Sequence, residues 1–151
     1  MKNSPLQLEH YCVTAVHLDA NLDAKVPEKI EWRINSKCDF ATHRDDSRRW
    51  KVDLTISFHA ADEATGPYKG SVSFIGFFAV DDTYSEEKVK LLVETNGPSV
   101  LFGSVREMVA NLTARGPWPM VLLPTQSFYK SPAKPAAAPA RSTTPGPLKE
   151  V

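Results

Sequence analysis

The chain has 151 residues, enough for one domain with a conventional hydrophobic core, or for one domain and a tail. Apolar residues make up 42% and charged residues 24%, and 18 basic side chains balance 18 acidic ones. Binding to phosphate backbones requires clustered cations, so this balance argues against nucleic acid as a partner. The chain lacks the apolar run of a signal peptide or a membrane span, and its two cysteines are too few for a secreted disulfide framework. We therefore expect a cytoplasmic protein without membrane insertion.

Two strands are predicted in the first third of the chain. The first runs from Leu6 to Leu18, with an irregular alternation of apolar and polar residues. The even-numbered positions of this strand are mostly apolar: Leu6, Leu8, Cys12, Val16 and Leu18. His10 and Thr14 interrupt this series, and the odd-numbered positions also hold apolar residues: Tyr11, Val13 and Ala15. The second strand is short and alternates over Ile30–Asn35, with Trp32 on its apolar side.

Two further strands follow. The third is the clearest, because Trp50, Val52, Leu54, Ile56 and Phe58 lie on one face and polar residues lie on the other. The fourth spans Tyr68–Val80 and becomes apolar on both faces around Phe77, which predicts a strand covered on both sides. Short connections between strands favour an antiparallel meander. The mixed-charge run His43–Arg49 is interpreted as a solvated connector.

After the fourth strand, the apolar residues recur at the spacing of an α-helix. Thr83 and Glu86 have the spacing of a capping box, which predicts a short helix ending near Gly97. Pro98 is suited to the first turn of a second helix that stops at Gly116. An apolar segment bounded by Pro119 and Pro124 comes next, and a tail rich in proline and alanine begins at Ser131. We predict an α+β fold: a four-stranded antiparallel sheet packed with one long and one short helix over residues 1–130, and a disordered tail over 131–151.

The segment PSVLFGSVREMVANLTARGPWPMVLLPTQSF, residues 98–128, resembles the C-terminal signature of the SecB export-chaperone family. The matching features are Pro98, Leu101-Phe102, Arg106-Glu107, Arg115-Gly116, Pro119 and the Leu-Pro-x-x-x-Phe pattern that ends at Phe128. The resemblance implies an ATP-independent chaperone that holds unfolded polypeptides in apolar grooves between sheet and helix, supports protein export, and assembles as a dimer of dimers. It also implies that the long helix lies between the dimers.

The chain also departs from the family. The second long helix that usually flanks the groove is missing or reduced, because Tyr129-Lys130 leads directly into the tail. Acidic positions that the family uses to dock the SecA motor correspond to Ala15 and Ser71, and only Asp19 keeps its carboxylate. The resemblance therefore favours client binding over docking to SecA.

Large apolar side chains suit a site that tolerates many client sequences, because they give contact area with little directional demand. Our candidates for the client groove are Trp32, Phe77, Trp118, Met120, Leu122 and Phe128, and the alternative for each is a place in the core. The wide apolar arc of the second helix gives the candidates for an oligomer interface: Leu101, Val105, Met108 and Leu112.

Two other functions are weighed. The same fold could serve as a dedicated binder of a single partner, such as an antitoxin. A small-ligand-binding or hydrolytic domain has only scattered polar residues behind it, since the chain has no phosphate-binding loop, no nucleophile elbow and no metal-ligand spacing among its four histidines. We therefore expect no enzyme activity, no catalytic residue, no metal and no cofactor.

Overall fold

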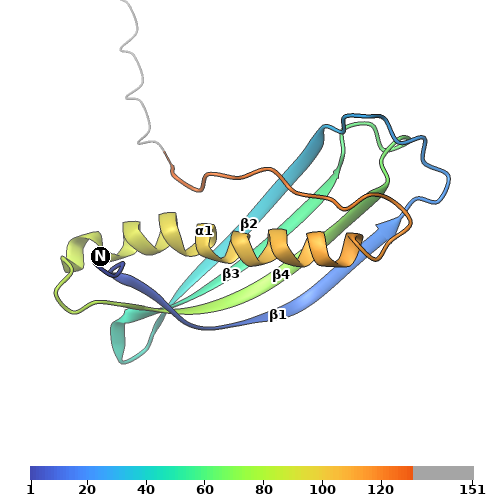
Figure 1. Ribbon diagram of the computed structural model, residues 1–151. Coiled ribbons are helices and arrows are strands. Elements are labelled where there is room, and N and C mark those ends of the chain that lie inside the picture. The colour runs from blue at the N-terminus through green and yellow to red at the C-terminus, as the bar shows by residue number, and fades with distance from the viewer. Residues whose placement is uncertain (131–151) are drawn as a thin grey trace, which may run out of the picture.

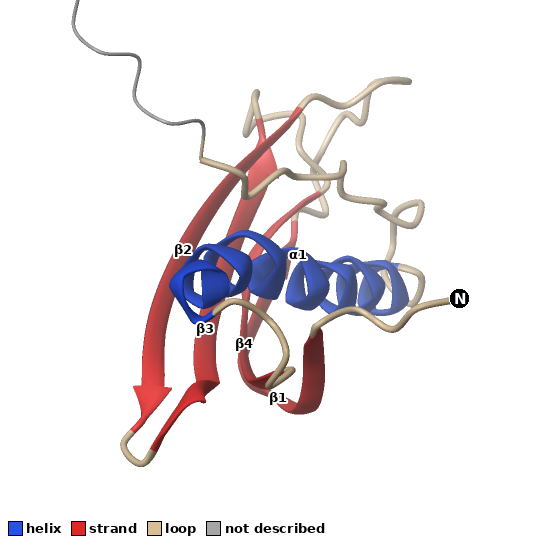
Figure 2. Ribbon diagram, turned by 90° about the vertical axis from the view of Figure 1, so that its left-hand side faces the viewer, coloured by secondary structure: helices blue, strands red, loops and turns tan. Residues whose placement is uncertain are grey.

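The computed structural model describes residues 1–130, and the predicted tail lies outside the described residues. Four antiparallel strands form one sheet, and a single long helix covers one of its faces (Figures 1 and 2). The elements are β1 (Leu6–Ala20), β2 (Trp32–His43), β3 (Asp46–Ala60), β4 (Tyr68–Val80) and α1 (Glu86–Thr113). The predicted α+β class is confirmed.

The strand order in the sheet is β1-β4-β3-β2. The three later strands form the predicted meander, whereas β1 pairs with β4 and a long connection leads from β1 to β2 at the opposite edge. β4 is therefore one of the two central strands. The prediction that it is covered on both sides is wrong, because among the described residues only the face toward α1 is covered. Phe77, on the face away from α1, is 41% exposed.

Two register shifts explain the irregular alternation of β1. Pairing with β4 skips one residue after Leu8 and another after Val13. Each shift inserts an extra residue and reverses which parity faces α1. The side facing α1 consequently carries an unbroken apolar series, because these residues pair with the α1-facing positions of β4: Leu6, Leu8, Tyr11, Val13, Val16 and Leu18.

The hairpin between β2 and β3 is longer than predicted. β2 continues to His43 and β3 begins at Asp46, so the charged run lies mostly within the two strands. The Arg48 guanidinium donates hydrogen bonds to the carbonyl oxygens of Asp81 (2.7 Å) and Tyr84 (2.8 Å). The interpretation of this run as a solvated connector is wrong at Arg48, which ties the hairpin to the segment before α1.

The two predicted helices are one. α1 continues through Pro98, which is buried, although proline removes one backbone hydrogen bond from a helix interior. The predicted capping box is also wrong, because the helix begins at Glu86, and Ser85, at the N-cap position, makes no side-chain capping bond. Thr83 instead donates its backbone N–H and its hydroxyl to Asp81 Oδ1.

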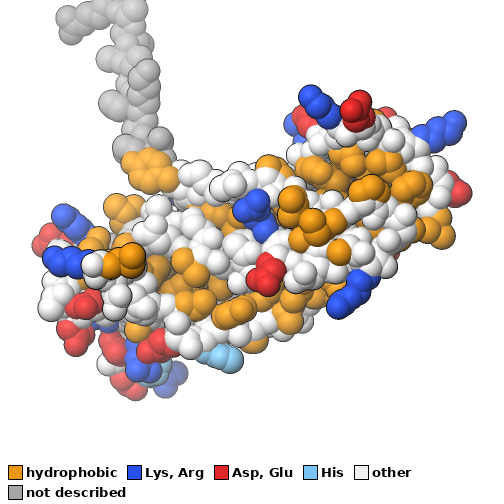
Figure 3. Space-filling model, viewed as in Figure 1, with side chains coloured by type: hydrophobic (Ala, Val, Ile, Leu, Met, Phe, Trp, Pro, Cys, Tyr) orange, Lys and Arg blue, Asp and Glu red, His pale blue; other side chains and the backbone are white. Residues whose placement is uncertain are grey.

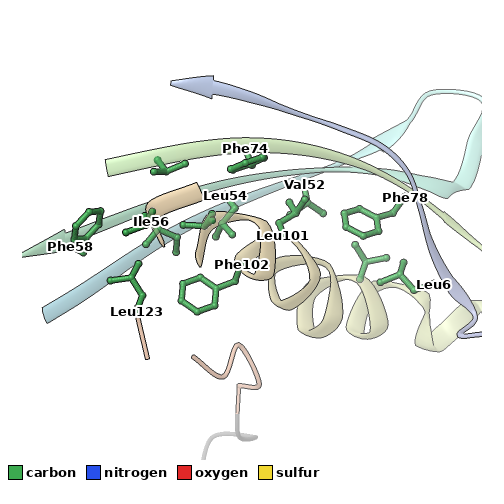
Figure 4. Close-up of a cluster of buried hydrophobic side chains, with 14 of the residues drawn as sticks. Leu6, Val52, Leu54, Ile56, Phe58, Phe74, Phe78, Leu101, Phe102 and Leu123 are labelled. Atoms are coloured by element: carbon green, nitrogen blue, oxygen red, sulfur yellow. The ribbon is translucent and has the colours of Figure 1, made fainter. Parts of the chain in front are cut away.

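The core lies between the sheet and α1 (Figure 4). Val52, Leu54, Ile56 and Phe58 of β3 are buried beneath the helix residues Leu101, Phe102 and Val105. Two glycines permit this close approach. A Cβ atom at Gly76 would lie 2.7 Å from Leu101 Cδ2, and one at Gly97 would lie 3.2 Å from Val52 Cγ2.

Candidate functional site

After α1 the chain turns back and runs across the helix side of the sheet as an extended arm, residues 117–130 (Figure 1). Burial alternates along the first half of this arm. Val121 and Leu123 are buried in the core, whereas Met120 and Leu122 are 51% and 63% exposed. The arm therefore behaves like a strand that packs by side chains on one side only.

Several hydrogen bonds hold the first half of the arm. Val121 donates its backbone N–H to Thr113 Oγ1 (2.9 Å), and the Arg106 side chain donates to the Leu123 carbonyl (2.7 Å). The Trp118 backbone N–H donates to the Tyr68 hydroxyl (3.1 Å), and its indole N–H donates to the Asn21 carbonyl (2.9 Å). Trp118 is thus a half-buried anchor of the arm, which limits the surface that this predicted groove residue can offer.

A hollow of about 300 Å³ separates β2 from α1 on the helix side of the sheet. Its strand wall is formed by Ser36, Cys38 and Phe40, and its helix wall by Glu94 and Pro98. Residues Ser127–Lys130 of the arm also line this hollow. We call this hollow, together with the α1-facing residues of β2, the β2 groove.

The β2 groove extends beyond that hollow in both directions. Trp32 and Ile34 lie on the same face of β2 as Cys38, and both are half-buried. The Trp32 ring contacts the Phe58 ring edge-on at 6.0 Å. Leu91, which is 59% exposed, lies one turn before Glu94 on α1 and so extends the helix wall. The result is a long, half-buried apolar surface.

Both the backbone and the side chains of this groove can contact a ligand. β2 is an edge strand, so one row of its backbone N–H and C=O groups has no strand partner within residues 1–130. Burial raises the pKa of the Cys38 thiol, while the charge of Lys130 acts in the opposite direction. Within residues 1–130 no group of three His, Cys, Asp or Glu side chains could hold a metal ion. The groove can accept an extended chain and offers little for acid–base chemistry.

Apart from Trp118, the predicted groove residues lie in three different places. Trp32 lies in the β2 groove, and Phe128 contacts the Phe102 ring edge-on at 5.8 Å beside it. Met120 and Leu122 point outward from the arm. Phe77 lies apart from the β2 groove, on the opposite face of the sheet, where its ring stacks on the His10 ring with centroids 6.2 Å apart.

Sequence reasoning missed the walls of the groove. The strand wall consists of three alternate residues, Ser36, Cys38 and Phe40. Because Ser36 is polar and Cys38 is small, the alternation of apolar and polar residues is weak in this segment. The sequence predicts a helix start at Pro98, whereas the structure places this buried residue in the helix wall of the groove. The period-two alternation of Cys38 and Phe40 is the signal that could have extended the second predicted strand.

The predicted oligomer interface needs correction. Leu101 and Val105 are fully buried within one protomer, under the sheet, so they have no surface for a second subunit. Met108 and Leu112 are half-buried on the neighbouring face of α1. Next to Met108 lies an apolar stripe on β1 whose three members are each more than 40% exposed: Tyr11, Val13 and Val16 (Figure 3). We call these three residues the β1 stripe.

The face of the sheet away from α1 carries both signs of charge beside the exposed ring of Phe77. Lys37 and Asp39 approach to 4.0 Å, and Lys51 and Asp53 to 3.4 Å. Ala15 and Ser71 lie on this same face, with Asp19 beyond them toward the end of β1. The surface that the resemblance associates with SecA is therefore of mixed charge here.

No helix in the described part of the chain is both long and apolar enough to cross a membrane.

The model of the family described as "preprotein translocase subunit SecB" matches residues 6–131. The chain is 31% identical over 103 residues to the protein-export protein SecB of Alcanivorax borkumensis, covering 65% of each protein. It is 27% identical over 120 residues to an uncharacterized protein of Methanocaldococcus jannaschii, covering 79% of this chain and 77% of the relative.

The solved structures that are similar along most of the chain include that of a chaperone. It is the SecB-like chaperone of Mycobacterium tuberculosis in complex with a ChAD peptide from the HigA1 antitoxin. The TM-score is 0.61 at 16% identity, and the match covers 80% of this chain and 90% of the other. At that identity the likeness concerns the fold alone. The family match, in contrast, spans the sheet, α1 and the arm, so this chain belongs to the SecB family.

Proposed function

We propose that this protein is an ATP-independent chaperone that holds unfolded polypeptides in the β2 groove and thereby supports protein export. Family membership supports a chaperone role. The observation that carries the proposal is the groove itself, which runs along an edge strand of the sheet and is bordered by an extended segment of polypeptide, residues 127–130.

Two kinds of contact would hold a client there. The free backbone groups of β2 can pair with an extended client, as in other cases of strand addition. Alternate client side chains would then enter the groove between Phe40 and Pro98. Burial of apolar surface contributes about 25 cal/mol per Å², so several weak contacts add up without any sequence-specific polar recognition.

An aggregation assay tests this proposal. We expect the protein to suppress light scattering by a chemically denatured protein after dilution, in the absence of ATP. Phe40→Ser should weaken suppression, because Phe40 lines the groove. The matched control is Phe77→Ser, on the opposite face of the sheet, which should leave suppression unchanged. Equal losses in two folded variants, or no suppression by the wild type, would refute the assignment.

We also propose that a second copy of the chain covers the β1 stripe, giving the homo-oligomer that the family resemblance implies. β1 is the other edge strand of the sheet, and the stripe continues onto α1 through Met108. Met108→Asp should lower the mass measured by mass photometry. The control Leu22→Asp alters a loop residue that is 73% exposed, and it should leave the mass unchanged. A folded Met108→Asp variant of unchanged mass would contradict this placement.

A dedicated binder of one partner remains the second candidate function. The similar solved structure of a SecB-like chaperone bound to an antitoxin peptide favours it. Docking to SecA has less support on this chain, because Ala15 and Ser71 stand where the resemblance places acidic residues. Titrations with two unrelated, permanently unfolded proteins distinguish the candidates. A general holdase binds both with similar affinity, whereas a dedicated binder discriminates strongly between them.

A further inference from the structure

The two halves of the arm are held by different interactions. Residues 117–123 are tied by hydrogen bonds to α1, β4 and the loop after β1, and Leu123 is fully buried. Beyond Pro124 this pattern stops. No hydrogen bond joins residues 124–130 to residues 1–123, and the one bond found there lies within the segment, from the Tyr129 backbone N–H to Ser127 Oγ. We call residues 124–130 the strap.

The strap is held in place by side-chain packing. Phe128 is half-buried, its ring contacts Phe102 edge-on, and it lines the hollow between β2 and α1 together with its neighbours in the strap. Tyr129, the next residue, is 60% exposed. A segment held by one aromatic ring can leave without breaking backbone hydrogen bonds, so its local opening is far less costly than unfolding of the domain.

We infer that the strap covers the β2 groove as a built-in competitor, and that a client polypeptide must displace Phe128 before it binds there. This inference rests on the proposed function and assigns a regulation to the same site. Phe128 then covers the groove and competes with the client, which reverses the role that the sequence predicted for it.

Competition of this kind lowers apparent affinity. When only a fraction of molecules has an open groove, the apparent dissociation constant rises by the inverse of that fraction. For one half-buried aromatic side chain we expect an open fraction of about one tenth, which corresponds to about 1.4 kcal/mol. Removal of the Phe128 ring should therefore tighten client binding about tenfold.

The test measures binding and strap position separately, on the full-length chain. The binding probe is fluorescein-labelled, reduced and carboxymethylated α-lactalbumin, titrated by fluorescence anisotropy. The variants are Phe128→Ala, the partial replacement Phe128→Leu, and the control Tyr129→Ala, which removes a neighbouring ring that is mostly exposed. Circular dichroism melting identifies any variant that is not folded.

Strap position is reported by the two cysteines. Cys38 is half-buried in the β2 groove beside the strap, whereas Cys12 is exposed on the other face of the sheet and serves as an internal reference. We expect Phe128→Ala to raise the rate of maleimide labelling at Cys38, relative to Cys12, several-fold. Tyr129→Ala should leave that ratio near the wild-type value.

Four outcomes decide the inference. Tighter binding with faster Cys38 labelling in Phe128→Ala, and a smaller change in Phe128→Leu, support it. Wild-type binding that is unchanged or weakened by Phe128→Ala overturns it and leaves the proposed function standing. Tighter binding without a change at Cys38 also overturns it, because the ring then acts elsewhere. If neither the wild type nor the variant binds the probe, the proposed function fails, and the inference fails with it.

Discussion

Two adjacent leucines provide a sharp test of how the arm packs. Leu123 is fully buried, whereas Leu122 is 63% exposed on the other side of the same extended segment. Leu123→Ala removes three buried carbon groups, at about 0.8 kcal/mol each, and leaves a cavity that costs more. We expect the free energy of unfolding to fall by about 2.5–4 kcal/mol. Leu122→Ala should change it by less than about 0.5 kcal/mol.

The assay is urea denaturation followed by tryptophan fluorescence, at one fixed protein concentration because association shifts apparent stability. The melting temperature of Leu123→Ala should fall by about 10 °C for a domain of this size. Leu122→Ala also shows whether the outward side of the arm contacts clients, since any loss of probe binding would then occur without loss of stability. Equal destabilisation by the two variants would refute the alternation of burial along the arm.

Three further predictions concern packing and hydrogen bonding elsewhere in the fold. A Cβ atom at Gly116 would lie 2.0 Å from the Tyr68 hydroxyl oxygen, so Gly116→Ala should lower unfolding stability by about 1–3 kcal/mol. At Gly103 a Cβ atom would meet nothing within 4 Å, so Gly103→Ala should raise unfolding stability by about 0.5–1 kcal/mol. Urea titrations in which the two glycine variants change stability in the same direction would contradict this. Thr113→Val leaves the buried Val121 N–H unpaired and should cost about 1–3 kcal/mol by the same method, whereas a neutral effect would refute the role of Thr113 Oγ1. Hydrogen bonds from the Thr83 hydroxyl and backbone N–H hold the pKa of Asp81 below its ordinary value, so their stabilising effect is present above about pH 4 and is lost as the pH falls through the folded-state pKa. The NMR titration midpoint of Asp81 should therefore rise in Thr83→Val, and an unchanged midpoint would contradict this cause.

The alternation of apolar and polar residues was enough to predict a strand wherever one face of that strand is buried without interruption. β3 alternates cleanly from Trp50 to Phe58 because one of its faces is buried along its length. β1 could not be interpreted in this way, since two extra residues reverse its parity and only pairing with β4 reveals where they lie. The β1 stripe, and with it the proposed interface, was hidden for that reason.

The sequence predicted that an apolar groove exists, but it did not identify most of the residues that line it. Trp32 and Phe128 were identified from size and sequence context, and the structure brings both to the β2 groove or its margin. Phe77 is as large and as apolar, yet β4 places it on the opposite face. Composition does not distinguish the two faces of a strand that is apolar on both.

The sequence by itself determined the α+β class, the four strands, the limit of the folded domain that we predict near Lys130 and the family resemblance. These properties depend on local periodicity and on a contiguous motif, residues 98–128. Only the tertiary structure decided that α1 continues through Pro98, that β2 forms an edge beside a groove, and that Phe128 lies at that groove. Burial between α1 and the sheet can stabilise a helix across a proline, and long-range pairing sets which strand is left at an edge; neither effect is encoded in any short window of residues.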